Sequence, residues 1–335
     1  MLVVTGGAGF IGSNLIYALN NSGRTRILLV DDLTDTSKIR NLANLEIADY
    51  LDKDEFLEIV KKSGLPQGIT GIFHQGACSD TMVSDGRYVM AVNYEYSKAL
   101  CHASVDAGVP FIYASSASVY GRDGPFLESG EGESPLNAYA YSKHLFDRYI
   151  RALDAGSGRQ IVGLRYFNVY GPGEDHKGRM ASVAWHLAAQ YHENQTVRLF
   201  EGSGGYEHGE QRRDFIHVAD VARVNLFFLE HPEHSGIFNV GTGVSQSFND
   251  VALATINACR EVDGESAVSL EEAKRQGVLT YFSMPQALAG KYQSFTQAPI
   301  SALRSIGYDH PYIDVDEGVR GYVQERYQEL KQNSP

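Results

Sequence analysis

The sequence lacks several features that mark specialised classes of protein. It has only three cysteines, Cys78, Cys101 and Cys259, and an odd number without a Cys-x-x-Cys pair offers no disulfide framework. A reducing compartment is therefore expected. No apolar run approaches the roughly 20 residues that span a bilayer, and Met1 leads into an apolar run without a basic segment or separate leader. We expect a cytoplasmic protein with no membrane partner.

Positive charge is also scarce. The 29 lysines and arginines against 41 aspartates and glutamates give a formal net charge of -12, whereas a dedicated nucleic-acid binder usually carries a basic face. A small anionic substrate stays compatible with this balance, because a local basic cleft can form on an acidic protein. Hydrophobic residues make up 43% of the 335 positions, which fits a globular chain with one large and one smaller domain.

Histidine is present, but its spacing indicates no metal site. His231 and His234 flank Pro232 without a surrounding cysteine or carboxylate framework, so a surface loop is the better interpretation. His176 and His186 are expected to make polar contacts. We therefore predict no metal.

Short apolar runs alternate regularly with helix-length segments in the first half of the chain. The apolar runs predict buried strands at 2–4, 27–30, 71–74, 111–114 and 161–165. The longer segments predict helices at 11–20, 53–62, 94–107 and 140–153. This alternation predicts an α/β fold with a doubly wound parallel Rossmann sheet.

A glycine-rich turn joins the first predicted strand to the first helix. Gly6, Gly9 and Gly12 let the backbone turn tightly and approach a pyrophosphate, whose charge would meet free N–H groups at the helix N-terminus. An ordinary strand–helix turn is the alternative, but acidic residues at the end of the second strand supply the context that a dinucleotide site requires.

The residues after the second strand leave the choice of dinucleotide open. A carboxylate of Asp31 or Asp32 can accept hydrogen bonds from the adenosine ribose, which favours NAD. Lys38 and Arg40 follow shortly and could neutralise a 2′-phosphate, which favours NADP, and Lys53 is a further candidate. Each cation could equally be a solvated surface charge.

Three residues together predict an alcohol-oxidising site. Tyr139 and Lys143 are four residues apart at the start of a predicted helix and so share one face. The lysine ammonium is expected to lower the pKa of the tyrosine and to hold the nicotinamide ribose. Ser116 follows a strand at the carboxyl edge where open α/β sheets place their ligands, so its hydroxyl could bond the reacting alcohol.

Four motifs resemble those of the extended short-chain dehydrogenases: 5–12, 115–121, 139–143 and 165–172. This resemblance covers nearly the whole chain and implies an enzyme that acts on a nucleotide sugar through a bound dinucleotide. Sugar 4,6-dehydratases of the family carry an Asp-Glu pair where this chain has Ala117 and Ser118, which argues against elimination chemistry.

More selective segments resemble the ADP-glyceromanno-heptose 6-epimerase branch of that family: 74–79, 176–182, 199–203, 213–215 and 292–297. This resemblance implies inversion of C6 of the heptose through a transient ketone, for the inner core of lipopolysaccharide. It implies that Tyr139 serves one face of the sugar and Lys177 the other, although Lys177 could also be a phosphate contact or a surface charge. A UDP-hexose 4-epimerase is the enzyme alternative. A non-catalytic dinucleotide sensor is the remote one, which the Tyr–Lys pair disfavours.

The same resemblance implies the binding residues. Cofactor contacts are expected at Gly6, Gly9, Phe10, Ile11, Gly12, Asp31, Asp32, Lys38, Lys53, Gln75, Gly76, Ala77, Cys78, Ser79, Asn93, Lys143, Val169 and Lys177. Substrate contacts are expected at Ser116, Asn168, Arg179, His186, Phe200, Glu201, Gly202, Ser203, Arg213 and Tyr292. One NADP, or alternatively NAD, would stay bound through turnover in each subunit of a homo-oligomer such as a pentamer.

Three features depart from the family pattern, and a further residue, Arg213, allows another interpretation. Residues 206–211 look like an extra loop, Arg179 stands where a small residue is common, and Asp32 replaces a commoner Asn. Arg213 suits a diphosphate because a guanidinium binds it bidentately, but an ion pair with Asp214 or Glu210 is the alternative.

The alternation of predicted strands and helices ends after about residue 168. Helices are expected around 181–193 and 248–260, whereas 263–297 shows no clear pattern. We predict that 1–168 and about 213–235 form the dinucleotide-binding domain. We predict that about 169–212 and 236–330 form a smaller, partly discontinuous α/β substrate lobe. The last residues, 331–335, are expected to fray.

Overall fold

The chain passes between two units more than once. The computed structural model describes residues 1–122, 124–285 and 293–332. Unit 1 consists of Met1–Tyr166, Ala219–Val240 and Pro299–Asp309, and unit 2 consists of Phe167–Val218, Gly241–Ala298 and His310–Pro335. Among the described residues, no helix has the length and apolar character needed to cross a membrane.

Unit 1 is built on a sheet of seven parallel strands. In chain order these are β1 (Leu2–Thr5), β2 (Ile27–Asp31), β3 (Asp49–Asp52), β4 (Gly71–His74), β5 (Phe111–Ser116), β6 (Ile161–Tyr166) and β11 (Gly236–Val240). Their spatial order is β11-β6-β5-β4-β1-β2-β3. The strand order reverses between β1 and β4, and the loops that follow such a reversal form the ligand crevice of open α/β sheets. The predicted doubly wound parallel sheet is confirmed.

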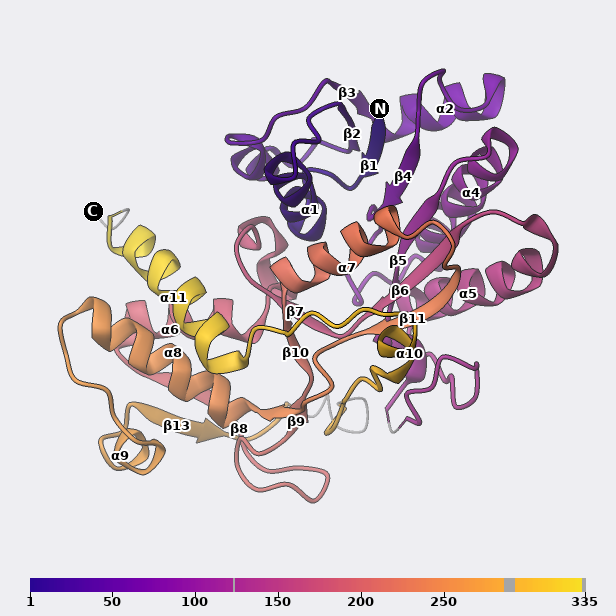
Figure 1. Cartoon of the computed structure of the whole chain (residues 1–335). Coiled ribbons are helices and arrows are strands. Elements are labelled where there is room, and N and C mark those ends of the chain that lie inside the picture. Colours follow the sequence, from indigo (N-terminus) through magenta and orange to yellow (C-terminus); the bar gives the residue numbers. More distant parts are fainter. Residues whose placement is uncertain (123, 286–292, 333–335) are drawn as a thin grey trace. The chain divides into compact units, whose positions relative to one another are not determined.

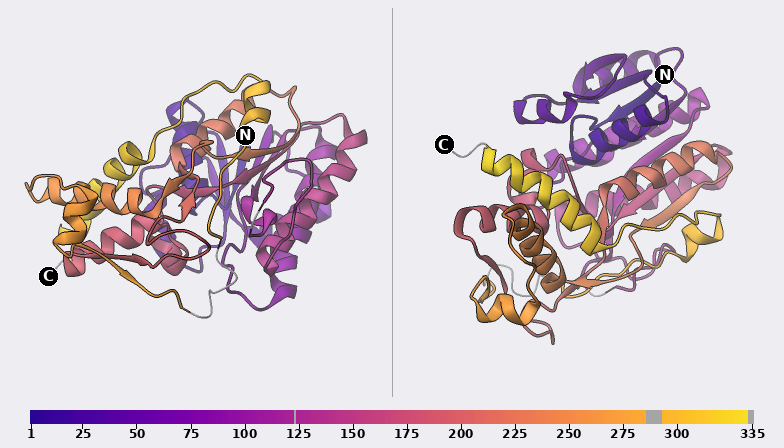
Figure 2. Two further views of the ribbon diagram at one scale, coloured as in Figure 1. Left: turned by 90° about the horizontal axis from the view of Figure 1, so that it is seen from below. Right: turned by 60° about the vertical axis from the view of Figure 1, so that its left-hand side comes forward.

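Helices cover both faces of this sheet (Figures 1 and 2). They are α1 (Phe10–Asn21), α2 (Lys53–Ser63), α3 (Gly86–Met90), α4 (Tyr96–Ala107), α5 (Ala138–Ser157), α7 (Val218–Glu230) and the short α10 (Ser301–Ser305). Phe56 of α2, Leu100 of α4 and Phe146 of α5 share one apolar cluster with Val3 and Ile72 of the strands. These three helices therefore pack on one face, and α1 and α7 lie on the other.

Unit 2 is a layer of helices with short strands. Its helices are α6 (Val183–Asn194), α8 (Phe248–Val262), α9 (Leu270–Arg275) and α11 (Val315–Gln332), with the 3-10 segment η4 (Asp175–Met180). Its strand pairs are β7 (Asn168–Tyr170) with β10 (Phe215–His217), β8 (Val197–Phe200) with β13 (Leu279–Phe282), and β9 (Arg212–Arg213) with β12 (Gln246–Ser247). Leu187 of α6, Ile256 of α8 and Val323 of α11 share one apolar core.

The observed units begin and end at different residues from the predicted domains. Residues 213–218 stay in unit 2, because β10 pairs with β7 there. Residues 236–240 form β11, which belongs to unit 1 because it pairs with β6. Residues 299–309 also return to unit 1, where α10 contacts β11. The apolar strand at 71–74, expected to be third in the chain, is β4, since the partly exposed β3 precedes it.

Candidate active site

The turn between β1 and α1 is shaped by its glycines. Gly6 has φ +66°, and a Cβ there would lie 2.6 Å from backbone atoms of Gly76 in the loop after β4. A Cβ on Gly12 would lie 2.0 Å from the Gly6 carbonyl oxygen. Gly9 differs, because a Cβ there would meet only the Gly6 oxygen, at 3.2 Å. Phe10 and Ile11 begin α1 just after Gly9, so an open backbone face and helix N–H groups fit the pyrophosphate of a dinucleotide.

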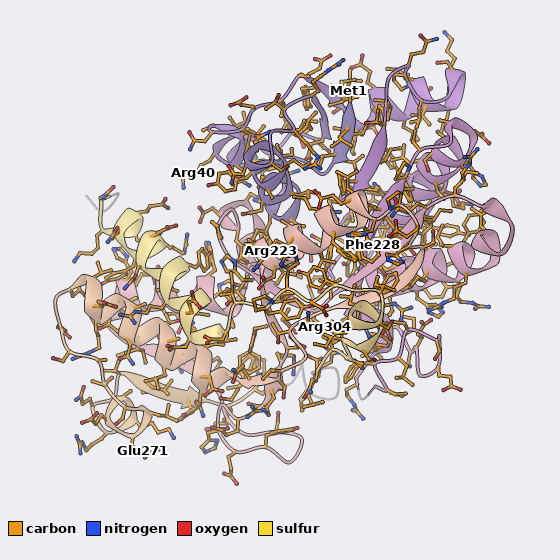
Figure 3. The ribbon with its side chains drawn as sticks, in the orientation of Figure 1. Met1, Arg40, Arg223, Phe228, Glu271 and Arg304 are labelled. Carbon is orange, nitrogen blue, oxygen red and sulfur yellow. The ribbon has the colours of Figure 1, made fainter. Side chains whose placement is uncertain are left out.

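Two ion pairs gather at the carboxyl end of β2. The buried Asp31 carboxylate accepts the Ala8 N–H at 2.8 Å and the Lys38 ammonium at 3.1 Å. Lys53 donates to Asp32 at 2.8 Å, and this hydrogen bond holds the pKa of Asp32 well below its usual range. The exposed Arg40 follows in the 3-10 segment Thr36–Leu42 (Figure 3). The structure thus brings together four of the five residues considered for the adenosine end, namely Asp31, Asp32, Lys38 and Lys53.

The loop after β4 carries the next predicted cofactor residues, Gln75, Gly76, Ala77, Cys78 and Ser79. It is tied to the underlying elements at both ends. Gly76 donates its N–H to the Thr5 hydroxyl at 3.2 Å. The Asn93 amide exchanges two hydrogen bonds with the Cys78 backbone, at 2.8 and 3.0 Å, and also donates to Ser142 of α5 at 3.0 Å. Asn93 therefore links this loop to the helix that carries Tyr139 and Lys143.

His74, the last residue of β4, is a buried histidine between two hydroxyl groups. Its ring nitrogens lie 2.7 Å from the Thr5 hydroxyl and 2.7 Å from the Ser97 hydroxyl. Burial lowers its pKa from 6.5 to about 3. The imidazole is therefore neutral in the folded chain at pH values where an unfolded chain would protonate it.

This neutral histidine predicts an acid-sensitive fold. Because the folded pKa lies below the unfolded one, the stabilisation is complete above about pH 7 and is lost as the pH falls toward 3. Between pH 7 and pH 5 the loss should be about 2 kcal/mol. Urea unfolding at several pH values measures it, and His74→Gln should flatten this part of the slope. An equal slope in both proteins would contradict the assignment.

Ser116 is set up as a hydrogen-bond donor at the end of β5. Its oxygen accepts the Ser118 N–H at 3.2 Å and the Ser118 hydroxyl at 2.9 Å. Since a serine oxygen has two acceptor sites, its own proton is left to donate. Ser116 also hydrogen-bonds the Tyr139 hydroxyl and thereby opposes the rise in the tyrosine pKa. Ser118 thus orients the predicted Ser116–Tyr139 pair.

Helix α5 places Tyr139 and Lys143 beside the same strand. Its N-cap is Asn137, whose side chain accepts the Ala140 N–H. Lys143 is buried and donates to the Ala114 carbonyl of β5 at 2.7 Å. The three predicted catalytic residues of unit 1 therefore meet at the carboxyl end of β5.

The electrostatics of the pair differ from the expectation. We expected the lysine to lower the pKa of Tyr139, but burial raises that pKa, with only the Ser116 hydrogen bond acting against it. Burial lowers the pKa of Lys143 to about 8, and the Asp147 carboxylate opposes this change. The expected direction for the tyrosine was wrong, because burial disfavours the charged phenolate and this effect sets the direction of the pKa shift.

An unpredicted buried network lies under this site. Asp147 accepts hydrogen bonds from the Tyr113 hydroxyl at 2.9 Å, the Ser115 hydroxyl at 2.8 Å and the Arg165 Nε at 2.8 Å. Arg165 also pairs with Glu133. Asp147 follows Lys143 by four residues, and this helical spacing was the available signal. Ser115 joins β5 to α5 through this carboxylate.

Lys177, the predicted second acid–base group, lies in η4 of unit 2. Its N–H bonds the Glu174 carbonyl at 2.8 Å, and Gly178 follows with φ +50°. Burial lowers the pKa of Lys177, and Glu174 opposes this effect. In the same unit Asn168 and Val169 lie in β7, Arg179 is exposed, and His186 contacts Trp185 edge-on at 5.0 Å between ring centroids.

The remaining predicted substrate residues follow β8. Phe200 packs on Phe282, Glu201 accepts the Ser283 hydroxyl at 2.7 Å, and Gln211 donates to Ser203 at 3.1 Å. Gly202 donates its N–H to His208 at 2.9 Å, so the extra loop at 206–211 folds back on this segment. Tyr292 lies outside the described residues.

Arg213 contacts two backbone carbonyls and an aromatic ring. Its guanidinium donates to the Arg212 carbonyl at 3.0 Å and to the Gln293 carbonyl, and it lies over the Phe248 ring. The Asp214 carboxylate accepts the Thr242 N–H at 2.7 Å, the Gly243 N–H at 3.0 Å and the Ala298 N–H at 2.9 Å. Glu210 accepts from the Asn249 amide at 2.6 Å. Asp214 therefore serves to join three backbone segments of unit 2.

The loop after α7 contains a carboxylate that the sequence interpretation overlooked. Glu233 lies 3.1 Å from His231 Nδ1 and 3.5 Å from His234 Nε2. The ligand atoms of these three side chains lie within 4.8 Å of one another. The statement that no carboxylate lies beside these histidines was wrong, since Glu233 stands between them in the sequence.

The fold and the site agree with a known class of enzyme. Residues 2–241 match the model of the NAD dependent epimerase/dehydratase family, and the chain belongs to this family. It is 58% identical over 322 residues to an ADP-L-glycero-D-manno-heptose-6-epimerase of Thiobacillus denitrificans, over 96% of this chain and 97% of that protein. The resemblance stated from the motifs is thereby confirmed.

Two solved structures of related enzymes are similar over almost the whole chain. One is the ADP-L-glycero-D-manno-heptose-6-epimerase of Helicobacter pylori, with a TM-score of 0.78, 29% identity, and coverage of 98% of this chain and 96% of that one. The other is the UDP-glucose 4-epimerase of Thermus thermophilus in complex with NAD, with a TM-score of 0.74, 26% identity and 98% coverage of both chains.

Proposed function

We propose that this chain is an isomerase that inverts C6 of the heptose in ADP-D-glycero-D-manno-heptose and gives the L-glycero epimer. The observation that carries this proposal is the 58% identity, over 96% of the chain, to a curated epimerase of that name. The Ser116–Tyr139 hydrogen bond supports it, because it places a proton acceptor beside a fixed donor at the end of β5. UDP-hexose 4-epimerisation is the second candidate, favoured by the 26% identity to the Thermus enzyme.

The residues of unit 1 would take the proton from the first face of the sugar. Tyr139 accepts the proton of the C6 side-chain alcohol, and Ser116 donates a hydrogen bond to the same oxygen. A bound nicotinamide supplies the acceptor and later the donor of hydride. The ketone that forms on the sugar then presents its other face, which inverts the centre when hydride returns. Lys143 holds its charge near the phenol and favours the tyrosinate that must be present before the first step, in which it becomes protonated.

The second face requires a separate proton donor, and Lys177 is proposed for this role. Burial lowers its pKa, which favours an amine that can both donate and accept a proton. Arg213 is proposed to bind the diphosphate, since its buried guanidinium is held by backbone carbonyls. For the other predicted substrate residues of unit 2, contact with the substrate is proposed from the family resemblance.

The test of the reaction is direct. Purified protein is incubated with ADP-D-glycero-D-manno-heptose, and proton NMR follows the inversion at C6. We expect the two epimers to reach an equilibrium mixture without added dinucleotide. Absence of inversion, together with interconversion of UDP-glucose and UDP-galactose under the same conditions, would transfer the assignment to the 4-epimerases.

The dinucleotide is proposed to be NADP, with NAD as the alternative. Lys38 and Lys53 offset the charges of Asp31 and Asp32, and Arg40 adds a further cation for a 2′-phosphate. Because the reaction has no net redox change, the dinucleotide need not leave between turnovers. Acid extraction of the purified protein followed by mass spectrometry should therefore yield one NADP per chain. An extract that contains only NAD would contradict this choice.

The family resemblance further supports a cytoplasmic homo-oligomer such as a pentamer. Multi-angle light scattering of the purified chain measures the number of subunits, and a monomeric mass would contradict this part of the proposal.

A further inference from the structure

Glu174 is a buried carboxylate that the chemistry above does not use. It is 1% exposed, and its Oε1 accepts the Gly171 N–H at 3.2 Å and the Ser182 hydroxyl at 2.7 Å. Its Oε2 accepts the Ser182 N–H at 2.5 Å. The Tyr322 hydroxyl of α11 also hydrogen-bonds this carboxylate. Each of these partners donates a hydrogen bond, so the position requires a side chain that only accepts hydrogen bonds.

These hydrogen bonds close a loop of unit 2. Gly171 and Ser182 stand at the two ends of the segment, and Glu174 joins them through one side chain. Lys177 lies near the middle of this loop, and its N–H is fixed to the Glu174 carbonyl at 2.8 Å. The backbone position of Lys177 therefore depends on two groups of Glu174. The Glu174 carbonyl binds the Lys177 N–H, and the Glu174 carboxylate closes the loop.

The next residue, Asp175, strengthens the same clamp. It accepts the Trp185 indole N–H of α6 at 2.9 Å and pairs with Arg326 of α11. The Arg326 guanidinium in turn lies 4.1 Å from the centre of the Trp185 ring. Two helices thus hold the two residues that begin the turn carrying Lys177.

Charge adds to this geometry. Glu174 raises the pKa of Lys177 against the effect of burial. Other ionisable groups also lie on the elements around this segment: Asp175, His176 and Arg179 in η4, His186 on α6, His217 on β10, and Tyr322 and Arg326 on α11. The effect of Glu174 on the pKa of Lys177 therefore has to be measured in the presence of these other ionisable groups.

We propose that Glu174 is a positioning residue for Lys177, whose carboxylate fixes the loop that carries the ammonium group and supplies its counter-charge. This inference rests on the proposed role of Lys177 in epimerisation. It extends that proposal by naming Glu174 as the residue that sets the position and the protonation of Lys177. A glutamine at this position would turn an N–H group toward a donor and would also remove the charge.

The experiment measures Lys177 directly on the full chain. Trace acetic anhydride labels amines competitively over a range of pH, and mass spectrometry gives the midpoint of labelling for each lysine. In Glu174→Gln the Lys177 midpoint should move down by about one pH unit, because the opposite charge is lost. The kcat of epimerisation should fall roughly tenfold to a hundredfold with a smaller change in KM, since the displaced amine acts on the chemical step.

A matched control separates this effect from charge removal in general. Glu271 precedes Lys274 by the same three residues on α9, at 3.1 Å, but its side chain is 83% exposed (Figure 3). Glu271→Gln should leave kcat and the Lys177 midpoint unchanged. Loss of kcat in this control as large as in Glu174→Gln would overturn the proposal.

Two outcomes distinguish the inference from the proposed function. A shifted Lys177 midpoint with unchanged kcat would support the positioning by Glu174 and remove Lys177 from the reaction. An unchanged midpoint and unchanged kcat in a folded Glu174→Gln protein would overturn the inference itself. If that variant does not fold, Glu174→Asp keeps the charge but shortens the side chain, and an unchanged Lys177 midpoint together with unchanged kcat in Glu174→Asp would overturn the inference equally.

Discussion

Replacing Tyr139 with phenylalanine is expected to reduce kcat of epimerisation by roughly 10²–10⁴-fold, the usual contribution of a positioned acid–base group. The substitution removes the phenolic oxygen that hydrogen-bonds Ser116 and keeps the ring in place on α5. Dinucleotide binding should persist, because the glycine turn and the ion pairs of Asp31 and Asp32 do not involve the phenol.

A control on the same helix is available. Tyr141 lies two residues further along α5 and is 49% exposed. Tyr141→Phe should retain kcat under conditions in which Tyr139→Phe loses it, and the dinucleotide content of each protein is measured by acid extraction. Wild-type turnover in Tyr139→Phe would remove the tyrosine from the reaction. Loss of the dinucleotide in that variant would show that the phenol acts in binding instead.

Replacing Arg165 with methionine is expected to destabilise unit 1 by about 3–5 kcal/mol, the usual cost of breaking a buried ion pair at one partner. Arg165 is 0% exposed, and it donates to Asp147 at 2.8 Å and pairs with Glu133. Methionine has a similar length but leaves the buried Asp147 without the guanidinium that pairs with it, whereas Glu133 keeps its pair with Arg151. Because Asp147 also holds Tyr113 and Ser115, the disturbance should spread to β5 next to Ser116.

The measurement has to report on the correct unit. The single tryptophan, Trp185, belongs to unit 2, so its fluorescence does not follow unit 1. Hydrogen exchange in α5 under increasing urea follows unit 1 directly. Arg320→Met is the control, because its pair with Glu261 is about half exposed and such pairs contribute roughly 0–1 kcal/mol. Equal losses in the two variants would show that the buried network adds no special stability.

The parts of the fold that the sequence could predict are those with a strong local pattern. The strands β1, β2, β4, β5 and β6 are apolar runs buried on both faces, and this is why they were recognisable. Strand β3 was missed because Asp49 and Asp52 begin and end it and no residue in it is fully buried. Helix α11 was missed because glycine and charged residues interrupt its apolar stripe, although Val319, Tyr322 and Val323 are buried.

The candidate site shows the same division. Ser116, Tyr139 and Lys143 were predictable because their spacing on a strand end and a helix face fixes their geometry locally. Glu174 was not predictable from its residue type, since its burial depends on Ser182 and on Tyr322, which lies 148 positions later in the chain (322 minus 174). The direction of the Tyr139 pKa was mispredicted for a related reason, because spacing in sequence says nothing about how much water surrounds a side chain.

The discontinuity of unit 1 has a consequence during synthesis. Strand β6 gains its outer neighbour only when residues 236–240 emerge from the ribosome, and α10 joins β11 later still. Until then β6 is an unpaired edge, which is a template for association with other nascent chains. The nucleotide-binding half therefore cannot finish folding before nearly all of the polypeptide has been made. We expect a fragment ending at residue 168 to aggregate where the full chain does not.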